Sequence, residues 1–397
     1  MSLTFHWFLP TYGDSRQIVG GGHGTLPGAA GGARPATLAY LGQIARSAEQ
    51  LGFVGALTPT GAWCEDAWLT TAMLTEVTEK LKFLVAFRPG LLSPTLAAQM
   101  AATFQRHSQG RLLLNVVVGG ESHEQRAYGD YLSKDERYAR ADEFLHIVRS
   151  LWRGGPVDFK GQHLSVEAAT IPRVPDPVPP LYFGGSSSAA GPVAARHSDV
   201  YLTWGEPLKD VAAKIEWIRA VSKAAGRELR FGIRLHVITR DTAEAAWREA
   251  ERLLAAIEPE QIQKIQAGLS RSESVGQKRM IALHKGSVEN LIVGPNLWAG
   301  VGLVRGGAGT ALVGSHTEVA ERIKEYAAAG ISEFILSGVP HLEEAYWFGE
   351  GVLPVLKREG LWKHPHLSGV DSNATVDVPF APTATRDRAN AVSSASS

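Results

Sequence analysis

Short apolar segments alternate with longer segments of helical periodicity along most of the chain. The stretch Phe231–Ile238 is one of the short segments, and its apolar residues, such as Leu235 and Val237, fall on one parity. Arg234 and His236 fall on the other parity. This length and composition predict a strand that directs a fixed cation and a titratable imidazole to one place. At a barrel mouth the pair suits a small anionic substrate; the alternation also fits an edge strand with two solvated polar residues.

Eight such strands, separated by segments of helical periodicity, make up most of the sequence. Strands alternating with helices form parallel crossovers, and eight units close into a (β/α)8 TIM barrel, an α/β fold. Because about 250 residues is typical of this fold, insertions must account for the surplus, and we predict one barrel domain over residues 1–362. The predicted strands are Leu3–Leu9, Phe53–Leu57, Leu81–Phe87, Arg111–Val118, Pro180–Phe183, Val200–Thr203, Phe231–Ile238 and Glu333–Leu336. The predicted helices are Thr37–Leu51, Asp66–Val77, Thr95–His107, Asp135–Trp152, Ser188–Arg196, Leu208–Ala225, Ala243–Ala256, Thr317–Ala329 and Leu342–Leu356, with a short hairpin at Asp158–Val166.

Three segments depart from this repeat. The interruption 258–315 follows the seventh strand and its helix and is rich in glycine near its end. Loops after barrel strands lie at the active face, so we predict a mobile lid, with an oligomer contact as the alternative. The Gly-rich stretch Gly20–Gly32 is a weak phosphate-loop candidate and is predicted to be a flexible surface loop. The polar tail 363–397 is predicted to be disordered.

Composition narrows the class of protein. The chain has 397 residues, of which 44% are hydrophobic, enough for a large core. Lys and Arg number 40, as do Asp and Glu, which argues against a general nucleic-acid or membrane-surface role. The single cysteine, Cys64, allows no intrachain disulfide and suits a reducing compartment. With no signal peptide and no apolar run of about 18 residues, we expect a cytoplasmic protein.

A Gly/Ser-rich stretch, Tyr182–Ser188, connects a predicted strand to a helix. Glycines let backbone N–H groups approach an anion, serine hydroxyls add donors, and the helix N-terminus adds partial positive charge. Because barrels often hold phosphate on late loops, we predict that Gly185, Ser186 and Ser187 bind a cofactor phosphate. Ordinary helix capping by serine is the alternative.

Cys64 precedes a predicted helix, where a thiol can have a lowered pKa; a small buried filler is the alternative. The chain lacks the Cys/His spacing of a structural zinc site, so we expect no metal. It also lacks a Gly-x-Ser-x-Gly elbow near a strand end, which argues against a serine hydrolase.

Several motifs together resemble a known family. They are Phe8-Leu9-Pro10-Thr11, Pro59-Thr60-Gly61, Cys64-Glu65-Asp66-Ala67-Trp68, Tyr182-Phe183-Gly184-Gly185-Ser186-Ser187, Tyr201-Leu202-Thr203-Trp204-Gly205-Glu206-Pro207, Arg234-Leu235-His236-Val237, the run from Asn296 to Gly307, and His341-Leu342-Glu343-Glu344-Ala345-Tyr346. On these residues the chain resembles the bacterial FMNH2-dependent alkanesulfonate monooxygenases of the luciferase-like flavin superfamily. The resemblance extends from about residue 3 to residue 356.

The resemblance implies a two-component enzyme. Reduced FMN, supplied by a separate NAD(P)H-dependent flavin reductase, would bind at the barrel mouth and react with O2. The carbon–sulfur bond of an organosulfonate would break, giving an aldehyde and sulfite, in a homo-oligomer (dimer or tetramer). By resemblance, the catalytic residues are Arg234, His236, Arg305 and Cys64; Trp204, Arg234, His236, Arg305 and His341 bind substrate; and Gly185, Ser186, Ser187 and Tyr138 bind FMN.

Two positions depart from the family pattern. Val339 stands where relatives have a tyrosine before Pro-His, so a hydroxyl implicated in catalysis is missing or replaced. Ala62-Trp63 stands where relatives have Arg-Ser, which changes the charge and shape of the pocket. A larger sulfonate such as the sulfosugar sulfoquinovose, or a neutral analogue, is therefore an alternative substrate. The sequence also fits a deazaflavin-dependent dehydrogenase of the same barrel family or a non-catalytic flavin-binding barrel.

Overall fold

The computed structural model describes residues 2–18 and 32–367. Most of the Gly-rich stretch 20–32, and the tail from residue 368, lie outside the described residues. Residues 363–367, predicted from the sequence to belong to a disordered tail, pack against the barrel instead. His364 and His366 lie 3.1 and 2.9 Å from the backbone oxygens of Gln50 and Phe53.

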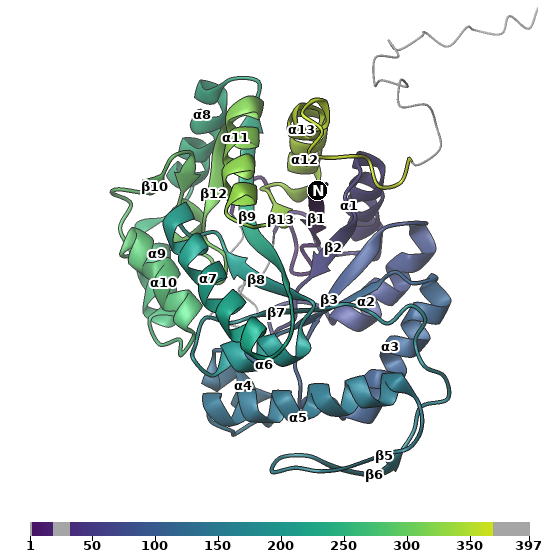
Figure 1. Cartoon of the computed structure of the whole chain (residues 1–397). Helices are drawn as coiled ribbons and strands as arrows, with labels where there is room; N and C mark the ends of the chain where they lie inside the picture. Colours follow the sequence, from purple (N-terminus) through teal and green to yellow (C-terminus); the bar gives the residue numbers. More distant parts are fainter. Residues whose placement is uncertain (1, 19–31, 368–397) are drawn as a thin grey trace, which may run out of the picture.

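Eight parallel strands close into a barrel, as predicted (Figure 1). Each barrel strand pairs in parallel with the next barrel strand along the chain, and the last barrel strand pairs with the first. The barrel is therefore closed and has no open edge. The barrel strands are β1 (Thr4–Phe8), β2 (Gly55–Thr58), β3 (Lys82–Phe87), β4 (Leu112–Val116), β7 (Leu181–Gly184), β8 (Val200–Trp204), β9 (Arg230–Arg240) and β13 (Glu333–Ser337).

Helices surround the barrel, and all except α4 lie close to predicted positions. They are α1 (Leu38–Leu51), α2 (Ala67–Leu74) with η1 (Thr75–Val77), α3 (Pro94–Ser108), α4 (Ser122–Ala127), α5 (Lys134–Arg153), α6 (Ala190–His197), α7 (Leu208–Ala224), α8 (Ala243–Ala255), α11 (His316–Ala328), α12 (His341–Tyr346) and α13 (Leu353–Arg358). The predicted closing helix is broken by a π-helical segment, η3 (Trp347–Val352). The hairpin β5 (Val157–Lys160) and β6 (Ser165–Ala169) is confirmed. No helix in the described ranges is long and apolar enough to cross a membrane.

The long strand β9 explains where the insertion returns to the barrel. β8 ends beside Arg234, so the edge of β9 beyond that residue is open to a new partner. That partner is β12 (Ala311–Ser315), which pairs in parallel with His236–Arg240. The rest of the insertion comprises α9 (Pro259–Leu269), α10 (Val275–His284), β10 (Ile292–Gly294), β11 (Leu297–Trp298) and η2 (Gly300–Leu303), elements that the sequence pattern did not predict.

The barrel interior near the amino ends of the strands holds a buried polar cluster centred on Glu333. Glu333 of β13 is buried and accepts a hydrogen bond from the hydroxyl of Tyr182 at 2.8 Å. His6 lies 3.3 Å from the same carboxylate oxygen, and Arg230 pairs with the other oxygen. These contacts lower the pKa of Glu333 although its burial acts in the opposite direction. The network seals the base of the barrel and leaves the carboxyl ends of the strands for the site.

Candidate active site

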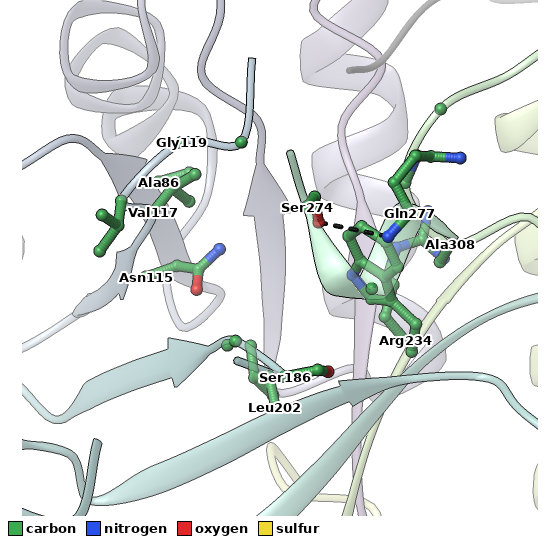
Figure 2. Close-up of a pocket in the computed structure, with 18 of the residues that line it drawn as sticks. Ala86, Asn115, Val117, Gly119, Ser186, Leu202, Arg234, Ser274, Gln277 and Ala308 are labelled. Carbon is green, nitrogen blue, oxygen red and sulfur yellow. Dashed lines mark hydrogen bonds between the residues drawn. The ribbon is translucent and has the colours of Figure 1, made fainter. Parts of the chain in front are cut away.

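A cavity of about 220 Å³ lies at the carboxyl ends of the barrel strands. Figure 2 shows Asn115 and Val117 on one wall and Arg234 and Ala308 on the other. Ser186 and Leu202 lie at its base in the same view. Seven of the predicted site residues line it: Tyr138, Gly185, Ser186, Ser187, Trp204, Arg234 and Arg305. The insertion therefore contributes to the cavity, whereas its mobility as a lid stays a prediction.

Arg234 is a buried cation at one end of the cavity. Its Nη2 donates to Ser337 Oγ at 2.7 Å, and Nη1 donates to the backbone oxygen of Leu235. Its guanidinium lies over the ring of Phe8, with Cζ 4.7 Å from the centroid. Burial, followed by the nearby charge of Arg305, lowers the pKa of Arg234 to about 9. Because its partners are neutral, the side chain is oriented without being neutralised.

Arg305 brings a second guanidinium from the insertion to the same end. It is buried, donates to the hydroxyl of Tyr12, and lies over two rings, 4.4 Å from the centroid of Tyr12 and 5.4 Å from that of Phe8. Burial raises the pKa of Tyr12, so its phenol stays protonated. Neither Arg305 nor Arg234 forms an ion pair with a carboxylate of the described residues. Two buried cations without a carboxylate partner create a strong preference for an anionic ligand.

His236 lies behind Arg234 and has both ring nitrogens occupied. Nδ1 lies 2.8 Å from Ser337 Oγ, and Nε2 lies 3.2 Å from the backbone oxygen of Ala308. Burial, together with the charges of Arg234 and Arg305, places the pKa of His236 well below its ordinary value. The imidazole is thus a neutral bridge between the barrel and the insertion, and the geometry does not favour the proton-transfer role that the resemblance implied.

His341 lies in the second layer behind Phe8, with their ring centroids 5.7 Å apart. Its Nδ1 is 3.0 Å from Asp14 Oδ1, and its backbone N–H donates to Oδ2 of the same carboxylate. Burial lowers the pKa of His341, so the imidazole is neutral. Although burial alone would raise it, the pKa of Asp14 is held at about 2 by these contacts with His341 and by a hydrogen bond from Tyr40. His341 therefore packs behind the end of the cavity where Arg234 and Arg305 lie. Its direct contact with substrate stays a prediction.

Cys64 differs from the expectation of an activated thiol. Its Sγ lies 3.5 Å from the backbone oxygen of Gly61 and 3.7 Å from that of Pro59. Burial raises the pKa of the thiol to about 12, which supports the buried-filler alternative over a lowered pKa. Burial is the main cause, and the nearby charge of Glu124 acts in the same direction. A protonated thiol in this position acts as a small filler, and its catalytic role stays an unsupported prediction.

The loop between β7 and α6 lines another part of the cavity. The N-cap of α6 is Ala189, and no side chain caps the helix, so the alternative of ordinary serine capping is wrong. In the described part of the chain, the backbone N–H groups of Ser186 and Ser187 donate to no backbone oxygen. A Cβ on Gly185 would lie 2.7 Å from Cβ of Ala190. The loop therefore keeps free donors and close backbone access at a helix N-terminus.

These features fit the phosphate of FMN. Ser187 Oγ is buried beside Tyr138 and, among the described residues, makes no hydrogen bond of ordinary geometry. Tyr201 donates to the backbone oxygen of Gly185 and so fixes the loop. Lys134 lines the same cavity and adds a cation at the α5 N-terminus. A phosphate monoester would meet free N–H groups, hydroxyls and a lysine.

Polar contacts join the insertion to the barrel around the cavity. Arg279 of α10 forms a bidentate pair with Glu206, at 2.8 and 2.7 Å. Lys214 donates to the same carboxylate at 2.9 Å. Within the insertion, Gln277 accepts a hydrogen bond from the backbone N–H of Gly307 at 2.9 Å. These contacts place Arg305 over the barrel mouth.

Sequence reasoning missed several residues that complete the site. Ser337 is the last residue of β13, one position beyond the predicted strand end, and a polar residue at the carboxyl end of a barrel strand was a usable signal. Tyr12 lies in the loop that follows β1, so its place after a barrel strand was also a usable signal. Lys134 and Gln277 gave no such signal, because only the folding of α5 and the insertion brings them to the cavity. Trp63, one of the two departures from the family pattern, lines the cavity, and its ring centroid lies 5.3 Å from that of Tyr12.

No group of three His, Cys, Asp or Glu side chains suited to a metal occurs within residues 2–18 and 32–367.

Residues 3–333 match the family model described as luciferase-like monooxygenase. Similar solved structures include riboflavin lyase RcaE with modified FMN and substrate riboflavin, at 22% identity and a TM-score of 0.75, covering 92% of this chain and 93% of that one. The EDTA monooxygenase EmoA from Chelativorans sp. BNC1 has 18% identity, a TM-score of 0.70 and coverage of 92% and 96%. An F420-dependent secondary alcohol dehydrogenase in complex with an F420-acetone adduct has 18% identity, a TM-score of 0.64 and coverage of 90% and 99%. At these identities the likeness shows a common fold.

Proposed function

Because the chain belongs to the luciferase-like monooxygenase family, we propose that it is a two-component flavin-dependent monooxygenase that releases sulfite from an organosulfonate. The observation that carries the proposal is the pair of buried guanidiniums, Arg234 and Arg305, which have no carboxylate partner among the described residues. A sulfonate is a permanent anion with three acceptor oxygens, and arginine offers forked donors to it. We also propose a cytoplasmic location, from the single cysteine and the sequence pattern, and a homo-oligomer, from the resemblance.

In this proposal the two ends of the cavity have different tasks. Ser186, Ser187 and Tyr138 would hold the FMN phosphate, and Lys134 would complement its charge. Reduced FMN, when bound, supplies the electrons that activate O2. The protein contributes position and shielding: the insertion covers the mouth, and the apolar walls exclude water from the reacting carbon. The arginine end would orient the sulfonate so that its carbon–sulfur bond faces the flavin.

Proton positions follow from the contacts at the arginine end. Arg305 donates to the hydroxyl oxygen of Tyr12, which leaves the phenolic proton for another acceptor. Tyr12 is thus a better candidate than His236 to donate a hydrogen bond to an oxygen of the ligand, because both nitrogens of His236 are occupied. Val339 is buried and its side chain offers no hydroxyl.

Sulfite release is the direct test. The protein is incubated with reduced FMN, O2 and a panel of alkyl, aryl and sugar sulfonates, and sulfite and aldehyde are measured. We expect sulfite from at least one member of the panel, and its loss in Arg234→Ala. No sulfite from the whole panel contradicts the proposal. Turnover of a reduced or oxidised deazaflavin without O2 would instead favour a deazaflavin-dependent dehydrogenase.

A further inference from the structure

The hydroxyl of Ser337 connects Arg234 to His236. Nη2 of Arg234 donates to Ser337 Oγ at 2.7 Å, and the same Oγ lies 2.8 Å from Nδ1 of His236. Ser337 is fully buried. We propose that Ser337 is a positioning residue that sets the orientation of the Arg234 guanidinium and, through His236, the position of the insertion segment 305–308. The inference rests on the proposed function only in taking Arg234 as the residue that binds the substrate anion.

The chemistry of the three groups fixes the direction of each hydrogen bond. A guanidinium only donates, so Ser337 Oγ accepts from Arg234 and its own proton is free for Nδ1 of His236. Nδ1 is then the acceptor, and the ring proton of His236 is on Nε2. Nε2–H donates to the backbone oxygen of Ala308, which cannot donate in return. The chain of donors therefore runs without a break from Arg234 to the insertion.

Strand register explains why position 337 can make both contacts. In the parallel pair of β9 and β13, Ser337 is the register partner of His236, and Ile335 is the partner of Arg234. The hydroxyl therefore lies between two side chains that project from alternate positions of one strand. The other terminal nitrogen of Arg234 is engaged with the backbone oxygen of Leu235. Removing the hydroxyl would leave Nη2 without its acceptor and let the imidazole exchange tautomers.

The chain of hydrogen bonds ends close to the second guanidinium. Ala308 lines the cavity three residues after Arg305 in the segment that also includes Gly306 and Gly307. Figure 2 shows Ala308 and Arg234 on the same side of the cavity. A small shift at His236 would therefore change the spacing between Arg305 and Arg234. Ser337 acts on the anion through this spacing, without contact with the anion itself.

Binding of hexanesulfonate without flavin tests the inference by isothermal titration. We expect Ser337→Ala to weaken binding at least tenfold, and Ser337→Thr, which keeps the hydroxyl, to bind within threefold of the wild type. Ser332→Ala is the matched control: Ser332 directly precedes β13, its hydroxyl donates to the backbone oxygen of Phe231 in β9, and it does not line the cavity. We expect that variant to bind within twofold of the wild type. Wild-type affinity in Ser337→Ala would overturn the inference.

The tautomer of His236 gives a second readout that needs neither ligand nor turnover. Histidine nitrogen NMR of the wild type at pH 7 should show His236 as the neutral Nε2–H form, assigned by its loss in His236→Gln. A proton on Nδ1 would overturn the inference, even if Ser337→Ala failed to fold. Conversely, if the wild type releases no sulfite yet binds hexanesulfonate in the expected order of variants, the proposed function fails and the role of Ser337 stands.

Discussion

The guanidinium of Arg305 lies against the ring of Tyr12, with Cζ 4.4 Å from the ring centroid and Nη1 donating to the hydroxyl. The two residues belong to segments almost 300 positions apart, the loop after β1 and the insertion before β12. This contact holds the guanidinium of Arg305 near that of Arg234, which β9 supplies. The anionic preference of the site is therefore a property of the insertion and the barrel together.

Arg234 should be irreplaceable by lysine. We expect kcat/KM for the sulfonate to fall by about 30- to 1000-fold in Arg234→Ala, or roughly 2–4 kcal/mol of transition-state stabilisation. Arg234→Lys should recover little, because one ammonium cannot reach both Leu235 and Ser337 while facing the cavity. Sulfite release measures the effect, and Arg252→Ala on the surface of α8 is the control. If Arg234→Lys kept activity close to that of the wild type, a positive charge at this position would be sufficient and the prediction would be wrong.

Anion binding should weaken at high pH. The pKa of Arg234 is lowered to about 9, so the free protein carries this charge below pH 9 and loses it as the pH rises above that value. Because the cationic form binds the anion, the affinity for hexanesulfonate should be constant up to about pH 8 and then decline towards a tenfold loss per pH unit. A bound anion favours the charged form, so turnover at saturation should decline at a higher pH. Titrations from pH 6.5 to 10.5 measure this, and constant affinity over that range would contradict it.

The β7–α6 loop should tolerate no side chain at position 185. In Gly185→Ala, the new methyl group would lie 2.7 Å from Cβ of Ala190 and 3.1 Å from the hydroxyl of Tyr138, so the loop must move. We expect the affinity for reduced FMN, measured anaerobically by fluorescence, to fall at least tenfold. In Gly42→Ala, the nearest atoms would be at 3.5 Å, and affinity should be unchanged. Equal affinities in the two variants would remove this loop from the cofactor site.

Cys64 should be dispensable for chemistry. With its pKa raised to about 12, the thiol is protonated at neutral pH and is a poor nucleophile. We expect Cys64→Ser and Cys64→Ala to keep kcat/KM within about threefold of the wild type. Iodoacetamide at pH 8 should modify the native protein slowly and the unfolded protein rapidly. A hundredfold loss of kcat with unchanged KM in both variants would restore a catalytic role.

The sequence was sufficient for the barrel because its strands and helices have different periodicities. The apolar runs that cover β1, β3 and β4 are buried on both sides, and the helix boundaries follow capping residues such as Thr37 and Ser133. Arg234 was identified because its parity in β9 opposes that of the core residues. The predicted closing helix contains a π-helical break at 347–352, and the sequence carried a signal for it in Gly349, Gly351 and Pro354, which disfavour a continuous helix.

Interactions over long distances were not predictable. The pKa of Cys64 depends on burial beneath chain segments that its local sequence does not reveal. The orientation of His236 depends on Ser337 and Ala308, which are 101 and 72 positions away. The helices of the insertion were missed because glycine and charged residues around 258–315 outweighed a weak periodicity. These are the places where tertiary packing decides the structure.

The central claim is that two buried guanidiniums make the cavity selective for an anionic head group. The most direct measurement is isothermal titration of the protein at pH 7.5 with three ligands of equal chain length: hexanesulfonate, hexanol and hexyltrimethylammonium. We predict that hexanesulfonate binds, that the two other ligands bind at least a hundredfold more weakly, and that Arg305→Ala reduces the difference at least tenfold. Equal affinity for hexanol, or unchanged selectivity in Arg305→Ala, would contradict the account.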